Sequence, residues 1–99
     1  MSYYAVVRSK GPGWDHGRKR REQQGWDEHA AFMDALAADG FVVLGGPLGQ
    51  EDGDDVLLIV DADSEADIHA RLAEDPWPDE MLTTASIRPW TVLLRGPKL

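Results

Sequence analysis

Residues 26–47, WDEHAAFMDALAADGFVVLGGP, constrain the fold most strongly, because a helix, its stop signal, a strand and a turn follow with almost no linker. Apolar side chains recur there at three- to four-residue spacing, which predicts a helix over residues 26–39 with one apolar side. Gly40 suits the left-handed residue that ends such a helix. A strand is then predicted over residues 41–44, running directly into a Gly-Gly-Pro turn.

The remaining elements complete a regular order around this stretch. The aromatic and β-branched residues near the N-terminus predict one strand, and an unbroken apolar run predicts another. Ser64 followed by Asp67 resembles the capping pair of a second helix, which Asp75 ends because it precedes a proline. The predicted elements are strands Tyr3–Val7, 41–44, Val56–Val60 and Ser86–Leu94, helices 26–39 and 64–75, and irregular segments at 11–25 and 76–85.

This order of strand, helix, strand, strand, helix, strand is typical of the α+β, ferredoxin-like βαββαβ fold with an antiparallel sheet. The 99 residues suffice for one domain, so residues 1–99 are assigned to a single unit. In that topology the first and third strands lie in the middle of the sheet. Pro47 and Pro89 agree with it, because they fall in the edge strands, where a missing amide hydrogen matters least.

The strands also predict a partner for the sheet. If two helices cover one face of an antiparallel sheet and water covers the other, strands alternate apolar and polar residues. Residues 41–44, 56–60 and 92–94 are instead unbroken apolar runs. We therefore expect a homodimer in which the two sheets pack face to face.

Charge and composition exclude several classes of function. Eighteen acidic against ten basic side chains disfavour nucleic acid and anionic membranes as partners. No cysteine is present, and three scattered histidines form no two-ligand motif, so no metal site is expected. No phosphate loop or dinucleotide fingerprint occurs, so no cofactor is expected. No apolar run approaches the roughly 18 residues of a membrane span, which favours a cytoplasmic protein.

Residues 11–25 form a long connection for so small a domain. Such loops are usually functional or disordered, and Trp14 in its middle indicates a loop that docks onto the rest of the protein. Four consecutive cations, Arg18 to Arg21, allow two interpretations. They form either a solvated charge run or an anion-attracting lid over a pocket, with Trp14 and Arg18 contacting the ligand.

His29 is the residue of the predicted helix most suited to chemistry, since it interrupts the apolar side. Asp75 lies in a segment that the neighbouring proline and tryptophan partly bury. A carboxylate beside an imidazole fixes its tautomer, which general acid or base catalysis requires. Gly45, Gly46 and Pro47 put bare backbone near a strand end, where a ligand can approach closely. The alternatives are a hydrogen-bonded core histidine and an ordinary helix-terminal aspartate.

Several motifs, taken together in order, resemble the YciI-like (YCII-related) family of the dimeric α+β barrel superfamily. They are Gly11-Pro12-Gly13-Trp14, Gly17, Gln23 or Gln24, His29, Met33, Leu36, Gly40, Gly45-Gly46-Pro47, Asp75-Pro76 and Pro89-Trp90. The resemblance implies a ferredoxin-like protomer, a dimer whose sheets form a barrel, and an active-site pair of His29 and Asp75. The sequence departs from the family pattern at residues 77–80 and in the basic stretch 18–21.

The resemblance further implies an enzyme of the lyase, dehydrochlorinase or isomerase kind, performing proton transfer or elimination on a small anionic or aromatic molecule. Two other functions stay open from the sequence. One is a binding module that holds the same small molecule without turnover. The other is a structural or accessory homodimer in which the polar pair only stabilises the fold.

Overall fold

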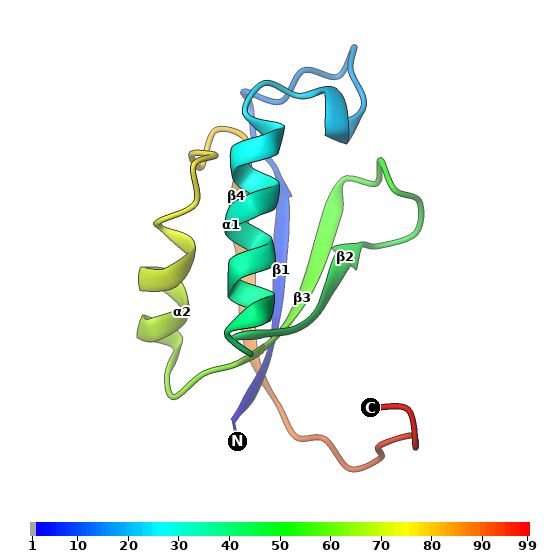
Figure 1. The fold of residues 1–99 in the computed structure, drawn as a ribbon, viewed down its shortest axis with the longest axis vertical. Coiled ribbons are helices and arrows are strands. Elements are labelled where there is room, and N and C mark those ends of the chain that lie inside the picture. Colours follow the sequence, from blue (N-terminus) through cyan, green and yellow to red (C-terminus); the bar gives the residue numbers. More distant parts are fainter. Residues whose placement is uncertain (1) are drawn as a thin grey trace.

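The computed structural model describes residues 2–99 as one four-stranded sheet with two α-helices and a short 3₁₀ helix (Figure 1). The strand order is β2-β3-β1-β4, and all neighbouring strands are antiparallel. This confirms the predicted βαββαβ fold, with the first and third strands in the middle. The elements are β1 Tyr3–Lys10, η1 Arg20–Glu22, α1 Trp26–Ala38, β2 Val42–Pro47, β3 Asp55–Asp61, α2 Glu65–Leu72 and β4 Leu82–Trp90.

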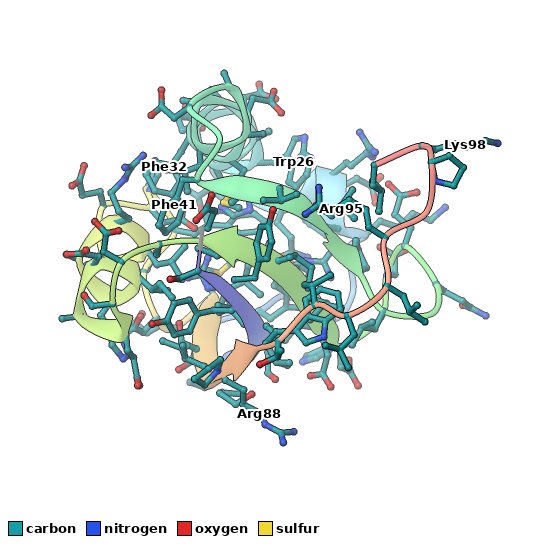
Figure 2. The ribbon with its side chains drawn as sticks, turned by 90° about the horizontal axis from the view of Figure 1, so that it is seen from below. Trp26, Phe32, Phe41, Arg88, Arg95 and Lys98 are labelled. Atoms are coloured by element: carbon teal, nitrogen blue, oxygen red, sulfur yellow. The ribbon has the colours of Figure 1, made fainter. Side chains whose placement is uncertain are left out.

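Both helices lie on the same face of the sheet (Figures 1 and 2). Phe32 and Phe41 lie close together between α1 and α2 (Figure 2). Three of the largest fully buried side chains, from α2 and the sheet, belong to this core: Ile68, Val6 and Val60. The fourth, Leu82, belongs to a second buried cluster with Trp14 and Trp77. The main core therefore lies between the helices and one sheet face, and neither helix covers the opposite face.

Hydrogen bonds confirm the predicted end of the first helix and start of the second, whereas α2 ends at Leu72, three residues before the predicted Asp75. Gly40 follows α1 with φ of +81°, and the Phe41 N–H donates to the Leu36 carbonyl at 3.1 Å. At the start of α2, the Ser64 hydroxyl accepts from the Asp67 N–H at 3.1 Å. These caps satisfy backbone groups that the helices leave unpaired.

The predicted bounds of the last strand are wrong by four residues at each end. The strand was expected over residues 86–94, whereas β4 runs from Leu82 to Trp90. The ladder is limited by its partner β1, whose ends pair as Lys10 with Leu82 and Tyr3 with Trp90. The apolar run 92–94 misled the prediction because hydrophobicity was taken for pairing, and Leu93 and Leu94 are in fact exposed.

The loop 11–25 docks onto the rest of the protein, as Trp14 indicated. Trp14 is buried, and so is the amide of Gln23, which donates to the carbonyls of Asp15 and Arg18. Arg20 is only 5% exposed and donates to the carbonyls of Glu51 and Gly53 in the β2–β3 connection. The basic stretch 18–21 is thus not wholly solvated, because Arg20 anchors the loop to the β2–β3 connection.

We expect Gly11→Ala to lower the free energy of unfolding by about 1 to 3 kcal/mol, the usual cost of overpacking. A Cβ at Gly11 would lie 2.3 Å from the Glu80 carbonyl oxygen, and backbone there cannot give way cheaply. Gly46→Ala is the matched control, because its Cβ would meet nothing within 4 Å. Urea unfolding of both variants measures the difference. Equal stabilities would contradict the close approach at Gly11.

Candidate active site

A cavity of about 610 Å³ lies between α1 and two neighbouring strands, the edge strand β2 and the inner strand β3. Trp26, Ala30 and Met33 line it from α1, which places the apolar side of the helix against the cavity. Both bulged ladders border it. The β2–β3 register shifts at Val43, which lines the cavity, and the β1–β4 register shifts between Val7 and Arg8. Bulges re-aim side chains in this way beside functional sites.

His29 lines this cavity and contacts Asp75, which is buried and does not itself line the cavity. His29 comes from the first turn of α1, and Asp75 follows α2, where its N–H donates to the Leu72 carbonyl at 3.1 Å. The His29 Nδ1 lies 2.9 Å from each carboxylate oxygen of Asp75. The structure therefore brings together the two residues that the sequence singled out, 46 positions apart.

Two further donors hold the Asp75 carboxylate. Arg8 Nη1 donates to Oδ2 at 3.0 Å, and the Trp77 backbone N–H donates to Oδ1 at 2.8 Å. Burial alone would raise the pKa of Asp75. The hydrogen bonds from His29, Trp77 and Arg8, with the charge of His29 when it is protonated, outweigh burial and lower this pKa below its ordinary value of 3.8.

The hydrogen bonds also determine the imidazole tautomer. An ionised carboxylate only accepts, so His29 Nδ1 must carry the hydrogen that it shares with Asp75. The other ring nitrogen, Nε2, has no hydrogen-bond partner among residues 2–99, and it is not one of the fully buried atoms. Since His29 lines the cavity, Nε2 is the atom left for a ligand.

Trp77 supplies the flat wall behind the imidazole. Its ring stacks on His29 at 4.0 Å between centroids and 12° between planes, and its Nε1 donates to the Gln24 carbonyl at 2.8 Å. Gly25 makes room for it, because a Cβ there would lie 3.1 Å from Trp77 Nε1. The departure from the family pattern at residue 77 therefore shapes the site directly.

Arg8 is the site residue that the sequence interpretation missed. It is 3% exposed and lines the cavity from the central strand β1. A signal was present, since Arg8 lies two positions after Val6, a residue of the core, and alternate residues of a strand share a face. A cation on the core face of a central strand needs a buried partner, and that requirement points to a buried carboxylate.

The other predicted ligand contacts divide into two groups. Gly45, Gly46 and Pro47 line the cavity, and they continue strand β2 instead of forming the predicted turn, because they pair with β3. Trp14 and Arg18 do not lie among its lining residues: Trp14 packs edge-on against Trp77 at 5.5 Å, and the Arg18 side chain is 61% exposed and pairs with Asp15.

Besides Arg8, two arginines of the basic stretch, Arg20 and Arg21, line the cavity. Arg20 also lies over the Trp14 ring, and Arg21 pairs with Glu51. Burial lowers the pKa of Arg20, an effect that Asp52 and Glu51 partly offset. A planar guanidinium stays charged in proteins, so both residues present positive charge to the cavity.

No group of three or more histidine, aspartate or glutamate side chains suited to a metal ion occurs among residues 2–99. The His69 side chain is exposed and pairs with Glu65, and His16 is exposed in the loop. No helix in the same part of the chain has the length and apolar character needed to cross a membrane.

A family model of the YCII-related domain matches residues 2–91 of this sequence. The chain belongs to the YCII-related family. Among solved structures, this YCII-related protein is similar to 5-chloro-2-hydroxyhydroquinone dehydrochlorinase from Burkholderia phenoliruptrix AC1100, in complex with 2,5-dihydroxybenzoquinone. The two share 20% identity and a TM-score of 0.59 over 91% of this chain and 92% of the other, which establishes a common fold. A comparison with curated protein sequences finds no match.

We expect acid to destabilise the protein through Asp75. Because folding lowers the pKa of this carboxyl from 3.8, its stabilising effect is complete above about pH 5 and is lost as pH falls through the folded value. Asp75→Asn should lose about 3 to 5 kcal/mol near neutral pH, since Arg8 is left without its partner. Its unfolding free energy should then change less on acidification than that of the wild type.

Urea unfolding between about pH 6 and pH 2 measures this difference. Glu74→Gln is the matched control, because it removes a neighbouring carboxylate that is exposed. If Asp75→Asn and Glu74→Gln show the same dependence on pH, Asp75 is not the group that links folding to acid.

Proposed function

We propose that this YCII-related protein is a small cytoplasmic enzyme that moves a proton, or eliminates a small group, in a compact, oxygenated or aromatic anion. His29 is the general acid or base, and Asp75 orients it. The observation that carries the proposal is the buried bond from His29 Nδ1 to Asp75 beside a cavity, which leaves Nε2 unengaged. That arrangement supports acid–base chemistry because an oriented imidazole can exchange a proton near neutral pH.

The cavity supports a ligand of limited size and negative charge. Its 610 Å³ falls within the range of about 300 to 1,000 Å³ common for small-molecule sites. Arg20 and Arg21 supply cations at one side, and Gly45 leaves the β2 wall without a side chain. The Trp26 ring, in the cavity wall 5.8 Å from His29, offers an apolar surface for a flat ring. These features favour a planar ligand with an acidic oxygen.

The ligand of the structural neighbour supplies a first probe. That protein is described as a dehydrochlorinase bound to 2,5-dihydroxybenzoquinone, a flat and oxygenated ring. At 20% identity the similarity supports a common fold but does not assign the substrate. The compound is therefore used here as a test ligand.

We expect His29→Gln to reduce turnover of a responsive substrate by about 100-fold or more, the usual contribution of a positioned acid or base. The screen uses 5-chloro-2-hydroxyhydroquinone, related hydroxyquinols and lactones, followed by absorbance. His69→Gln is the matched control, because that histidine is exposed and distant in sequence. Binding of 2,5-dihydroxybenzoquinone is measured in parallel by quenching of tryptophan fluorescence.

The outcomes separate the three functions left open by the sequence. Turnover by the wild type that His29→Gln abolishes supports the enzyme. Binding without turnover of any compound supports a binding module and removes the enzyme proposal. A His29→Gln variant that unfolds readily, in a protein that binds none of the probes, supports a purely structural pair.

We also propose that the uncovered sheet face pairs with the same face of a second copy. The observations that support it are apolar side chains on that face. Alternation along the strands places Ala5, Leu57 and Ile59 there, opposite to the core residues Val6 and Leu58. These three residues and Trp90 line a shallow pocket on that face, and Trp90 is 47% exposed. A monomer rarely leaves such a patch in water.

We expect light scattering to give about twice the 11.0 kDa mass of one chain at micromolar concentration. Ile59→Glu should reduce the mass to that of a monomer, because it puts a charge in the centre of the apolar face. Ala66→Glu, on the exposed side of α2, should leave the mass unchanged. A wild type that runs as a monomer removes the proposed pairing.

A further inference from the structure

Arg8 is a buried cation, and only some of its side-chain nitrogens have hydrogen-bond partners. Nη1 donates to Asp75 at 3.0 Å, and Nη2 donates to the Leu82 carbonyl at 3.3 Å. Its Nε is the single fully buried side-chain nitrogen or oxygen among residues 2–99 that has no hydrogen-bond partner. An arginine held this way is costly, and an apolar side chain in its place is often no less stable. A purely structural role therefore explains Arg8 poorly.

The charge balance around Asp75 suggests what Arg8 does. The Asp75 carboxylate touches two groups that can be positive, the Arg8 guanidinium and the His29 imidazole. With Arg8 present, the carboxylate is already neutralised, and His29 need only donate a neutral N–H. Without Arg8, the buried carboxylate would draw a second proton onto His29, because an unpaired buried charge is strongly disfavoured.

The other charged groups near the imidazole either disfavour its protonated form, as Arg8 does, or favour that form only weakly. Arg20 and Arg21 line the same cavity, and their positive charge opposes an imidazolium. Arg21 is also paired with Glu51. On α1 itself, Asp34 lines the cavity and favours an imidazolium, but it is exposed. Screening by water weakens that effect relative to the buried Arg8.

We propose that Arg8 is a positioning residue that neutralises Asp75, so that His29 stays an uncharged imidazole whose Nε2 accepts a proton from the ligand. The inference rests on the proposed function and sets the direction of its first step. The Nε2 lone pair forms the new N–H bond while a C–H or O–H bond of the ligand breaks. The electron pair of that bond stays on the ligand as an enolate or phenolate.

After this step the charges remain balanced inside the cavity. The cluster of Arg8, Asp75 and protonated His29 carries one net positive charge, and the ligand has gained one negative charge. Each therefore stabilises the other, because the opposite charges lie at hydrogen-bond distance. The ligand class that fits is a carbonyl compound with an acidic neighbouring C–H, or a ring hydroxyl that ionises to a stabilised anion.

The test uses ¹⁵N-labelled histidine in the full chain, without ligand, at about pH 7.5, where neutral and charged imidazoles give different ¹⁵N shifts. Wild-type His29 should show a protonated Nδ1 and a bare Nε2. In Arg8→Met the ratio of protonated to neutral His29 should rise about tenfold or more, and Arg8→Lys should restore most of the neutral form. The His29 signal is assigned by its loss in His29→Gln.

The exposed histidines, His16 and His69, are internal controls, and their signals should not change. An unchanged His29 signal in a folded Arg8→Met variant overturns the proposal, and so does a wild-type His29 that is already an imidazolium. If Arg8→Met does not fold, the wild-type spectrum and Arg8→Lys still decide. Because no ligand is present, a negative result here is distinct from failure of the turnover screen.

Discussion

The buried carboxylate of Asp75 is the group on which the site depends. It accepts hydrogen bonds from α1 through His29, from β1 through Arg8, and from its own turn through the Trp77 N–H. A buried charge is tolerated only with such partners. The Asp75 carboxylate therefore needs its three donors, and the buried Arg8 in turn needs the carboxylate. The end of α2, the start of α1 and the centre of the sheet are thereby held together at one point.

The shape of the cavity follows from local departures from regular structure around that point. Bulges shift the β2–β3 ladder at Val43 and the β1–β4 ladder at Ala85, opposite Arg8, where regular strands β2 and β4 would have kept strict alternation. Gly45 fits because a Cβ would lie 2.7 Å from Leu58 Cδ2 in the core. The loop 11–25 then closes one side through Arg20, which is fastened to the β2–β3 connection. Polar and apolar walls thus come from segments far apart in the sequence.

Much of the fold was predictable because it is encoded locally. Gly40 and Ser64 end and start helices through bonds to neighbours a few residues away, and the apolar periodicity of 26–39 needs no distant contact. The bounds of the last strand were not predictable in the same way. Its ends depend on where β1 ends, and the apolar residues 92–94 have no β1 partner.

The sequence by itself determined the order of the elements, the caps, and the two residues suited to acid–base chemistry, His29 and Asp75. Only the tertiary structure decided that these two touch, that Arg8 joins them, and that Arg20 and Arg21 reach the cavity in place of Arg18. The reason is physical. Periodicity and capping report interactions within a few residues, whereas the pairing of buried charges depends on which strand, turn and helix the fold brings within about 3 Å of one another.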